Sequence, residues 1–398
     1  MGFLKYPGGK DSESDVIRKY SPASFEDYYE PFVGGGAVYL DISARRYFIN
    51  DFSQDLINLY TCVKEQDEEF FQIMDEVNAV WKNMDRFIEE EQTNENGLFR
   101  IYRDYKLNTE NTEEAEATLK SALDAYLKNS GQKDRFKKLL DPLDAGGEDF
   151  FYDTCCDTLL RKMQRMKVLE YTKRHLPDED IKDNITCCLK GSFYMYMRHL
   201  YNHPKYRTNG FKAFIYLFIR DMCYSGMFRF NSDGKFNVPY GGLSYNNKTY
   251  DATIVKYRDE ALLGKLAKTT IGACDYYEFL QLHKPSANDF MFVDPPYDSE
   301  FCTYDQNSFD QLQQKKLANY LINECDCKFM LDIKSTEFIQ SLYPEGIKCK
   351  NGEKLRIIPF DKKYSVSFMD RNDKRVTHLL IMNYSSDQEA ENNAKHSN

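Results

Sequence analysis

The chain of 398 residues is long enough for two domains, or for one domain with a large insertion. It is 42% hydrophobic and 29% charged, a composition typical of a soluble globular protein. No apolar run reaches the roughly 18 residues that a membrane span needs. MGFLKYPGGK also lacks the apolar core of a signal peptide, so we expect a cytoplasmic protein. The 11 cysteines form no C-x-x-C pair and only 6 histidines accompany them, which favours reduced thiols over a metal site.

The formal net charge of −10 is unevenly distributed along the chain. Residues 64–190 carry 20 Lys and Arg against 29 Asp and Glu, a net charge of −9. Residues 191–250 carry 8 against 2, a net charge of +6. A basic segment inside an acidic chain is a better guide to partners than the total, and it keeps nucleic acid open as a partner.

Residues 1–60 alternate in the manner of βαβ units. EDYYEPFVGGG predicts an aromatic-rich strand that ends in a glycine turn, and AVYLDISARR has helical spacing. YFINDF predicts a second strand, followed by a helix from Ser53. Such alternation is typical of an α/β protein with a mostly parallel sheet.

The middle of the chain changes character. Residues 64–190 are charged and helix-prone, with breaks near 94–97, 129–131, 141–147 and Pro177, and they predict an acidic helical insertion. The aromatic and basic residues 191–250 predict a buried helix through Ile219, followed by a turn at Ser232–Gly234.

From residue 254 the alternating pattern resumes. DFMFVD and KFMLDI predict strands on either side of a helix, SFDQLQQKKLANYLINEC. KYSVSF and VTHLLIMNY predict an antiparallel hairpin joined by the charged turn MDRNDKR. The polar tail, residues 385–398, is expected to be disordered.

The glycines of PFVGGGAVYL lie between a strand and a helix, where Gly34 and Gly36 would let a ligand approach the backbone. A dinucleotide fingerprint needs a third glycine where Tyr39 stands, so a NAD oxidoreductase has little support. Asp51 ends the next strand, where a carboxylate can hold two ribose hydroxyls or cap the following helix.

The segment FMFVDPPY ends a buried strand with residues that cannot continue it. Proline donates no ladder hydrogen bond, so the Pro-Pro step stops the strand and leaves Asp294 at its carboxyl end. The Asp294 carboxylate and the Pro295 carbonyl form an acceptor pair suited to an exocyclic amino group. Tyr297 could stack on a nucleobase, which would have to be flipped out of a duplex.

Five segments occur in the order found in one known family: FLKYPGGK, EPFVGGGAVYL, NDFSQDLINLY, YSGMFRFNSDGKFNVPYG and FVDPPY. Over residues 1–63 and 191–384 the chain resembles the Dam-type (D12 class) DNA adenine-N6 methyltransferases, which use S-adenosylmethionine. The resemblance implies a Rossmann-like methyltransferase sheet with an inserted, mostly helical target-recognition domain. The catalytic domain would comprise residues 1–63 and 251–384, and residues 191–250 the target-recognition segment.

The resemblance also implies roles for individual residues. Tyr6 and Lys10 would contact the cofactor, Phe32 and the glycine turn would lie beside its methionine part, and Asp51 would hold its ribose. Asp294 would lie at both cofactor and base. Asp275 and Tyr276, in CDYY, would contact the cofactor's adenine.

In the recognition segment the resemblance implies that Arg229 reads a guanine edge, a pairing that arginine makes bidentately. Lys5 would approach DNA near the flipped base, and Met227 and Pro239 would pack against bases. Phosphate contacts would come from Lys205, Arg207, Lys212 and Lys248. A GATC-like target is implied, although the chain departs from the Dam pattern after Gly241.

Three further expectations concern partners and alternatives. The acidic insertion would scaffold the recognition segment rather than follow the DNA backbone, because its charge repels phosphate. The protein is expected to be a monomer, solitary or paired with a cognate restriction endonuclease. Methylation of RNA adenine or of cytosine N4, and a non-catalytic DNA-binding regulator, are the competing hypotheses.

Overall fold

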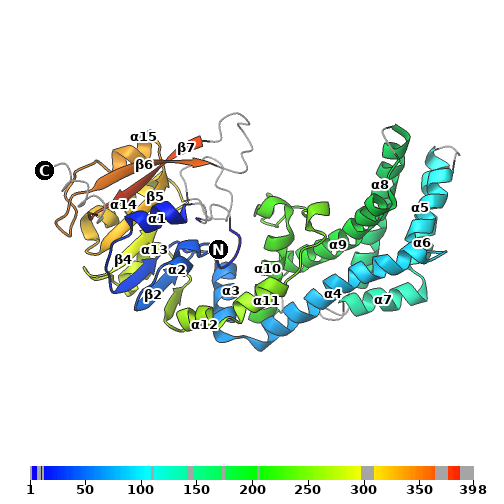
Figure 1. Cartoon of the computed structure of the whole chain (residues 1–398), viewed down its shortest axis with the longest axis horizontal. Coiled ribbons are helices and arrows are strands. Elements are labelled where there is room, and N and C mark those ends of the chain that lie inside the picture. Colours follow the sequence, from blue (N-terminus) through cyan, green and yellow to red (C-terminus); the bar gives the residue numbers. More distant parts are fainter. Residues whose placement is uncertain are drawn as a thin grey trace. The chain divides into compact units, whose positions relative to one another are not determined.

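The computed structural model describes residues 2–6, 10, 13–108, 112–140, 143, 147–172, 175–203, 207–296, 309–363 and 375–385. The chain forms two compact units, Met1–Lys64 with Glu260–Asn398, and Glu65–Asp259. The first, which contains the sheet, is called the α/β unit below, and the second is called the helical unit (Figure 1).

The α/β unit is built on a seven-stranded sheet with the order β3-β2-β1-β4-β5-β7-β6. Its strands are β1 (Asp27–Glu30), β2 (Arg46–Asn50), β3 (Thr269–Gly272), β4 (Phe290–Val293), β5 (Lys328–Lys334), β6 (Arg356–Lys363) and β7 (Arg375–Met382). Its helices are α1 (Ser14–Tyr20), α2 (Ala37–Asp41), α3 (Gln54–Glu65), α12 (Glu260–Ala267), α13 (Tyr276–Leu282), α14 (Gln311–Asn319), the π-helical turn η4 (Tyr320–Glu324) and α15 (Glu337–Leu342).

The five strands from β3 to β5 are parallel, and β7 runs antiparallel between β5 and β6. This arrangement confirms the predicted α/β class and the mostly parallel sheet. The predicted hairpin strand VTHLLIMNY is β7, but its described partner is β6, which begins at Arg356, upstream of KYSVSF. All of KYSVSF after Lys363 lies outside the described residues.

Helices cover both faces of the sheet, which explains why its central strands are almost wholly apolar. On one face, Tyr29, Met291 and Leu331 join a core cluster with residues of α13, α14 and α15. On the opposite face, the Tyr28 ring meets Phe290, and Tyr39 of α2 meets the ring of Tyr47. The alternation of side chains along each strand assigns them to these two faces.

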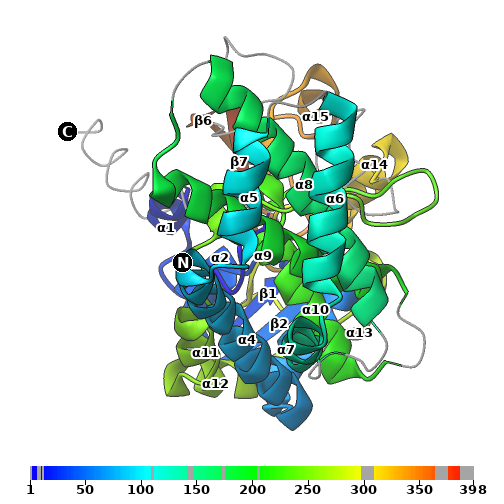
Figure 2. The same cartoon turned by 90° about the vertical axis from the view of Figure 1, so that its right-hand side faces the viewer.

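The helical unit is a series of helices separated by short breaks. They are α4 (Glu68–Thr93), α5 (Leu98–Leu107), α6 (Thr112–Leu127), α7 (Ser130–Leu140), α8 (Glu148–Thr172), α9 (Asp178–Asn202), α10 (Asn209–Met222) and α11 (Asp251–Tyr257), with 3-10 turns η2 (Tyr224–Gly226) and η3 (Leu243–Tyr245). In Figures 1 and 2, α5, α6 and α8 run side by side. Three of the four predicted breaks fall between these helices, with Pro177 at the start of α9, whereas α7 begins at Ser130, inside the break predicted at 129–131.

Local signals explain where two helices of this unit, α4 and α10, begin. The Asp67 side chain accepts a hydrogen bond from the Phe70 amide at the start of α4, and Thr208 caps α10 through the Phe211 amide. Apolar side chains at helical spacing then bury one side of α4, with Trp81 wholly inside. The acidic helices and the basic segment therefore share one core.

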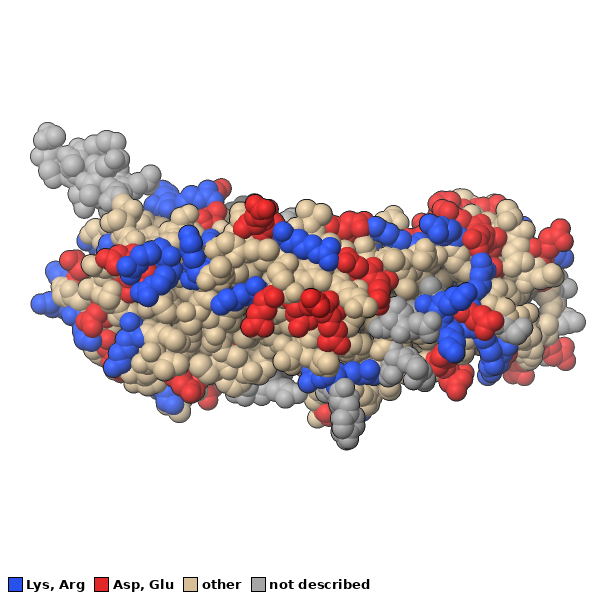
Figure 3. Space-filling model, turned by 90° about the horizontal axis from the view of Figure 1, so that it is seen from below, with Lys and Arg blue, Asp and Glu red and all other residues tan. Residues whose placement is uncertain are grey.

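Charged side chains of both signs are mixed over one face of the protein. On the face shown in Figure 3, Lys and Arg are interspersed with Asp and Glu rather than gathered into one large patch of either sign. Within the described residues, no helix is both long enough and apolar enough to span a membrane. The ten cysteines that the structure describes are all free.

Candidate active site at the carboxyl ends of β1 and β4

The sheet order changes direction between β1 and β4. From β1 the chain continues to β2 and β3 on one side, whereas β4 and β5 lie on the other side. In open α/β sheets such a switch point leaves a crevice outside the carboxyl ends of the two strands, where ligands bind. The glycine turn follows β1 there, and Asp294 follows β4.

The glycine turn has a backbone that other residues would strain. Gly34 and Gly36 have φ of 48° and 64°, in the left-handed region that glycine adopts readily. A Cβ atom on Gly36 would lie 2.3 Å from the Tyr60 hydroxyl oxygen, and that hydroxyl donates to the Gly34 carbonyl at 3.2 Å. The turn is thus fixed closely against its own unit, with Tyr6 packed over Gly34.

Asp51 connects this turn to the next helix. Its Oδ2 accepts from the Gly34 amide at 3.0 Å, and its Oδ1 accepts from the Ser53 amide at 3.0 Å, just before α3 begins at Gln54. The carboxylate thus holds the turn before α3, while the Ser53 hydroxyl accepts from the Leu56 amide at 3.4 Å and caps that helix. Each carboxylate oxygen has a second lone pair, so ribose binding by Asp51 stays a prediction.

Two of the predicted cofactor residues pack together beside the turn. The ring centroids of Phe32 and Tyr276 are 5.2 Å apart, and Phe309 lies 5.5 Å from Phe32. The neighbouring Asp275 caps α13, accepting from the Tyr277 amide at 2.9 Å. Phe309 was not predicted from the sequence, because nothing in its local pattern distinguishes it from a core phenylalanine.

Asn50 is a second residue that the sequence did not reveal. It is 1% exposed, and its side-chain amide donates to the carbonyls of Pro31 and Cys274. Its Oδ1 also accepts from the Cys274 amide at 3.2 Å. These bonds join the segments that follow β1 and β3 to the end of β2.

Lys10 is the centre of a buried group of charges. Its Nζ lies 2.9 Å from Asp294 Oδ1, 2.9 Å from Asp332 Oδ2 and 3.5 Å from Glu13 Oε2. The Lys10 side chain is only 4% exposed, whereas Asp294 is 22% exposed and so faces the crevice in part. The structure thus brings Lys10 and Asp294, which the sequence predicted separately, into one ion pair.

Asp332 of β5 and His378 of β7 complete this group. The Asp332 Oδ1 lies 3.0 Å from the His378 Nδ1, and both side chains are wholly buried. Burial acts to raise the pKa of Asp332, but the charge of Lys10 and the hydrogen bond with His378 outweigh it and leave that pKa below its ordinary value. The only signal in the sequence is a charged residue inside an apolar strand.

Glu30, the last residue of β1, is another buried carboxyl group near Asp294. Burial raises its pKa to about 8, and the charge of Asp294 adds to this effect. The Tyr28 hydroxyl donates to Glu30 Oε2 at 2.6 Å and acts in the opposite direction. Glu30 therefore holds a proton to a higher pH than an exposed glutamate does.

The prolines after Asp294 are held from α14. The Gln314 side chain, wholly buried, donates to the Pro296 carbonyl at 2.9 Å. Pro295 is buried, and its carbonyl remains the predicted second acceptor for an amino group. Tyr297, the predicted stacking residue, lies outside the described residues.

The predicted DNA-contacting residues of the helical unit lie together on one short ladder. Bridges between Cys223 and Tyr240 and between Phe230 and Phe236 form the ladder, which carries Met227, Arg229 and Pro239. Arg229 and Pro239 are exposed, and Met227 is half-buried. Lys5, predicted to approach the same DNA, is an exposed residue of the α/β unit.

Side chains of α9 anchor this ladder. Asn202 donates to the Phe236 carbonyl at 3.0 Å and accepts from the Phe236 amide at 2.8 Å. The Tyr194 hydroxyl donates to the Val238 carbonyl at 2.9 Å. Arg229 Nε lies 3.4 Å from Asn237 Oδ1 across the ladder, so its exposed guanidinium is steadied from within the same unit.

The residues predicted to contact phosphate differ from one another in burial and in the partners that they already have. Lys248 donates to the Asp221 carbonyl at 2.6 Å and lies 3.8 Å from the centroid of the Tyr245 ring, so it already has partners inside the unit. Arg207 lies over the Phe211 ring at 4.7 Å. Lys212 is half-buried on α10, and Lys205 lies outside the described residues.

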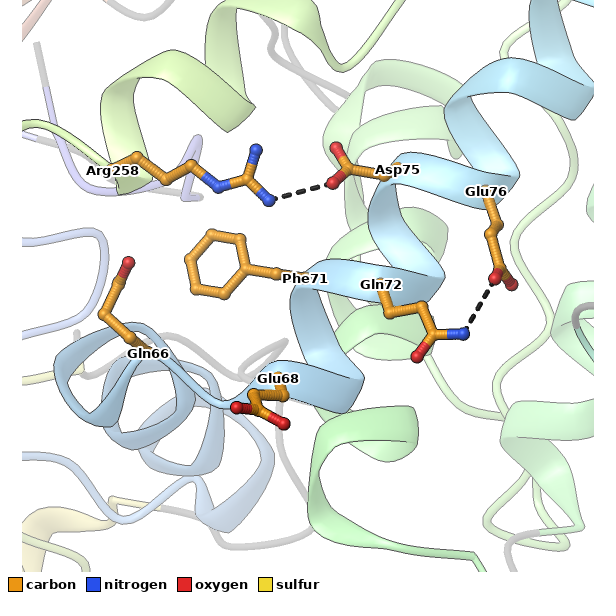
Figure 4. A pocket seen from close by; sticks show the side chains of 7 residues that line it. All are labelled: Gln66, Glu68, Phe71, Gln72, Asp75, Glu76 and Arg258. Carbon is orange, nitrogen blue, oxygen red and sulfur yellow. Dashed lines mark hydrogen bonds and ion pairs between the residues drawn. The ribbon is translucent and has the colours of Figure 1, made fainter.

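A surface hollow of about 480 Å³ in the helical unit contains none of the predicted site residues. It is lined by Gln66, Glu68, Phe71, Gln72, Asp75, Glu76 and Arg258 (Figure 4). Arg258 pairs with Asp75 at 2.8 Å and lies over the Phe71 ring. With Glu68 and Glu76, the lining as a whole carries a net negative charge. Within the described residues, no three His, Cys, Asp or Glu side chains are grouped as metal ligands would be.

Comparison with known proteins finds similar sequences among DNA methyltransferases. Type II methyltransferase M.MjaIII of Methanocaldococcus jannaschii is 24% identical over 404 residues, which cover 96% of this chain and 98% of that protein. Type II methyltransferase M.CviBI of Paramecium bursaria Chlorella virus NC1A is 32% identical over 169 residues, 42% of this chain and 60% of that protein. The DNA adenine methylase of Escherichia coli (strain K12) is 43% identical over 70 residues, 18% of this chain and 25% of that protein.

One family covers most of the chain. The sequence model of the D12 class N6 adenine-specific DNA methyltransferases matches residues 6–145 and 154–358, which include the glycine turn, the helical unit and β4. On this match, and on the strand order and strand-end residues described above, the protein belongs to the D12 class N6 adenine-specific DNA methyltransferase family.

Proposed function

We propose that this protein transfers a methyl group from S-adenosylmethionine to N6 of an adenine that is flipped out of duplex DNA. The observation that carries the proposal is the position of Asp294. It lies at the carboxyl end of β4, partly exposed at the switch point of the sheet and ion-paired to Lys10. A carboxylate at this place faces the region where open α/β sheets bind their ligands.

The residues around the glycine turn fit an adenosyl and methionyl ligand. Gly34 gives backbone access, Asp51 is a carboxylate beside it, and the rings of Phe32 and Tyr276 supply an apolar surface. When bound, S-adenosylmethionine supplies an electrophilic methyl group on a positively charged sulfur. The chain's own residues would bind that ligand and hold it next to Asp294.

Asp294 and the Pro295 carbonyl would then accept the two hydrogens of the adenine amino group. This contact favours the tetrahedral nitrogen that attacks the methyl carbon, because the ring otherwise delocalises the nitrogen lone pair. S-adenosylmethionine would supply the methyl group and leave as S-adenosylhomocysteine, and the proton that the amino nitrogen loses would pass to solvent. Most of the remaining rate would come from holding the two reactants in line.

Recognition of the target would fall to the ladder in the helical unit. Arg229, exposed and steadied by Asn237, is placed to read guanine, with Met227 and Pro239 beside it. Lys5 would contact DNA near the flipped base. We propose a GATC-like site, with the helices of residues 64–190 scaffolding this segment. The protein would act as a monomer, with a cognate endonuclease as a candidate partner.

A single assay tests the reaction. The protein is incubated with S-adenosylmethionine labelled with tritium in the methyl group. The substrates, in parallel reactions, are unmethylated plasmid and an RNA transcript of the same sequence, and each is digested to nucleosides. Label in N6-methyladenine is the expected result. Label in N4-methylcytosine, label only in an RNA transcript of the same sequence, or no label would each contradict the proposal. Sequencing of the methylated plasmid then identifies the recognition site.

A further inference from the structure

Strand register sets two carboxylates side by side at the candidate site. β4 and β5 are parallel neighbours, and at the carboxyl end of β4 Val293 pairs with Leu331. Asp294 and Asp332 follow these residues directly, so they occupy adjacent positions on the same face of the sheet. Like charges in such positions repel each other, and Asp332 is wholly buried. This pair therefore requires compensation from elsewhere in the chain.

The compensation comes from two segments far away in the sequence. Lys10, from the N-terminal segment, lies 2.9 Å from each of the two carboxylates. On the other side of β5, the antiparallel strand β7 pairs Leu380 with Asp332, which puts His378 diagonally across from that aspartate. The His378 ring is 3.0 Å from the second oxygen of Asp332. A continuous row of contacts thus leads from His378 through Asp332 and Lys10 to Asp294.

We propose that Asp332 and His378 are positioning residues for methyl transfer: they hold the Lys10 ammonium where it fixes the Asp294 carboxylate. The inference rests on the proposed function of Asp294. A role in stability alone would be served better by apolar residues, since buried ion pairs seldom add net stability. His378 orients Asp332, Asp332 orients Lys10, and only Lys10 and Asp294 border the reacting groups.

The test is a double-mutant cycle in single-turnover methylation of plasmid DNA. Asp332→Asn keeps the shape of the side chain but removes its charge, and should lower the rate about 10- to 100-fold, the order expected when reacting groups are misplaced. Lys10→Met should lower the rate further. The double variant should be no slower than Lys10→Met alone, because Asp332 acts through Lys10.

Variants of His378 separate its hydrogen bond from its bulk. His378→Leu removes the contact with Asp332 and should lower the rate about tenfold. His378→Asn restores an amide near the position of Nδ1 and should recover most of the rate. Equal losses in these two variants would overturn the role of His378.

Asp289→Asn is the matched control. Asp289 is also buried, next to the amino end of β4, and accepts hydrogen bonds from the amides of Asp27 and Ser286. Its replacement should lower the midpoint of urea unfolding without changing the rate per folded molecule. The midpoint of urea unfolding is also measured for the wild-type protein, Asp332→Asn, Lys10→Met and the double variant.

The outcomes distinguish the inference from the proposed function. If the wild-type protein methylates adenine and Asp332→Asn is fully active, the positioning role fails while the proposed function stands. Additive losses in the double variant, or coupling between Lys10 and Asp332 in unfolding but not in turnover, would also overturn it. A wild-type protein that leaves adenine unmethylated would overturn the proposed function itself.

Discussion

Each of the two units buries a lysine, and the surroundings of the two side chains differ. In the α/β unit, Lys10 lies between Asp294 and Asp332, where two parallel strands end. In the helical unit, Lys190 of α9 is wholly buried, contacts Asp85 and the Asn246 carbonyl, and lies 5.1 Å from the centroid of the Trp81 ring.

The difference follows from the two architectures. Parallel strands leave an open crevice beyond their carboxyl ends, so a charge held there can act on a ligand. Helices that pack by their side chains fill the space between them, so a charge buried there connects segments of the chain. A lysine buried at a strand end is therefore evidence for chemistry, whereas a lysine buried between helices is evidence for packing.

The largest loss of activity is expected for a replacement of Asp294, which acts in the α/β unit alone. Asp294→Ala should lower the methylation rate about 10³-fold, since it removes one of the two acceptors for the amino group. Binding of S-adenosylmethionine, measured by calorimetry, should persist. Asp326→Ala, an exposed aspartate of the same unit, is the control and should be fully active. Turnover preserved in Asp294→Ala would remove this residue from the mechanism.

A smaller effect concerns pH and the buried carboxyl group of Glu30. Its pKa of about 8 in the folded protein exceeds the ordinary value of 4.5, so the folded state keeps a proton that the unfolded state releases. Its contribution to stability is complete below pH 4.5 and is lost as the pH rises towards 8. Glu30→Gln should remove this dependence and raise the free energy of unfolding at pH 7 by up to roughly 3 kcal/mol.

The measurement is urea unfolding between pH 5 and pH 8, followed by circular dichroism. Glu26→Gln replaces an exposed glutamate just before β1 and serves as the control. The Tyr28 hydroxyl can still donate to the new amide oxygen, so the variant changes charge more than hydrogen bonding. An unchanged pH slope in Glu30→Gln would show that other groups set the pH dependence.

The smallest effect tests the packing role of Lys190. Lys190→Met leaves Asp85 and the Asn246 carbonyl without its ammonium, and should lower the free energy of unfolding by about 2 kcal/mol. Trp81 is the only tryptophan of the chain and is buried in this unit, so its fluorescence reports the transition. Lys182→Met, a change at a half-buried lysine of the same helix, is the control.

Lys190→Met should leave the cofactor site of the α/β unit unchanged, because Lys190 belongs to the helical unit. Affinity for S-adenosylmethionine should be the same in Lys190→Met as in the wild-type protein, whereas affinity for DNA should fall as η3 and its neighbours loosen. A loss of cofactor affinity equal to that of Lys10→Met would contradict the separate roles that we assign to the two lysines.

Local sequence patterns predicted most elements and several of the site residues. The Pro-Pro step ended β4 where expected because proline cannot continue a ladder, and the breaks of the helical insertion followed its Asn, Gly and Pro residues. AVYLDISARR was predicted too long, since α2 ends at Asp41. The helix predicted over SFDQLQQKKLANYLINEC begins only at Gln311 and continues as the π-helical turn η4. The glycine turn, Lys10 and Asp294 were identified by short motifs, whose chemistry is local.

The order of strands and the partners of buried charges were decided by the tertiary structure. Asp332 and His378 look like isolated polar residues in apolar strands, and the sequence says nothing of their contact. They meet because β5 and β7 pair in one register, and a shift of one residue would send each side chain to the other face. The sequence by itself determined where the strands stop and which residues follow them. Only the tertiary structure decided that Lys10, Asp294, Asp332 and His378 form one group, because contacts over such separations depend on the assembled sheet and on the N-terminal segment packed against it.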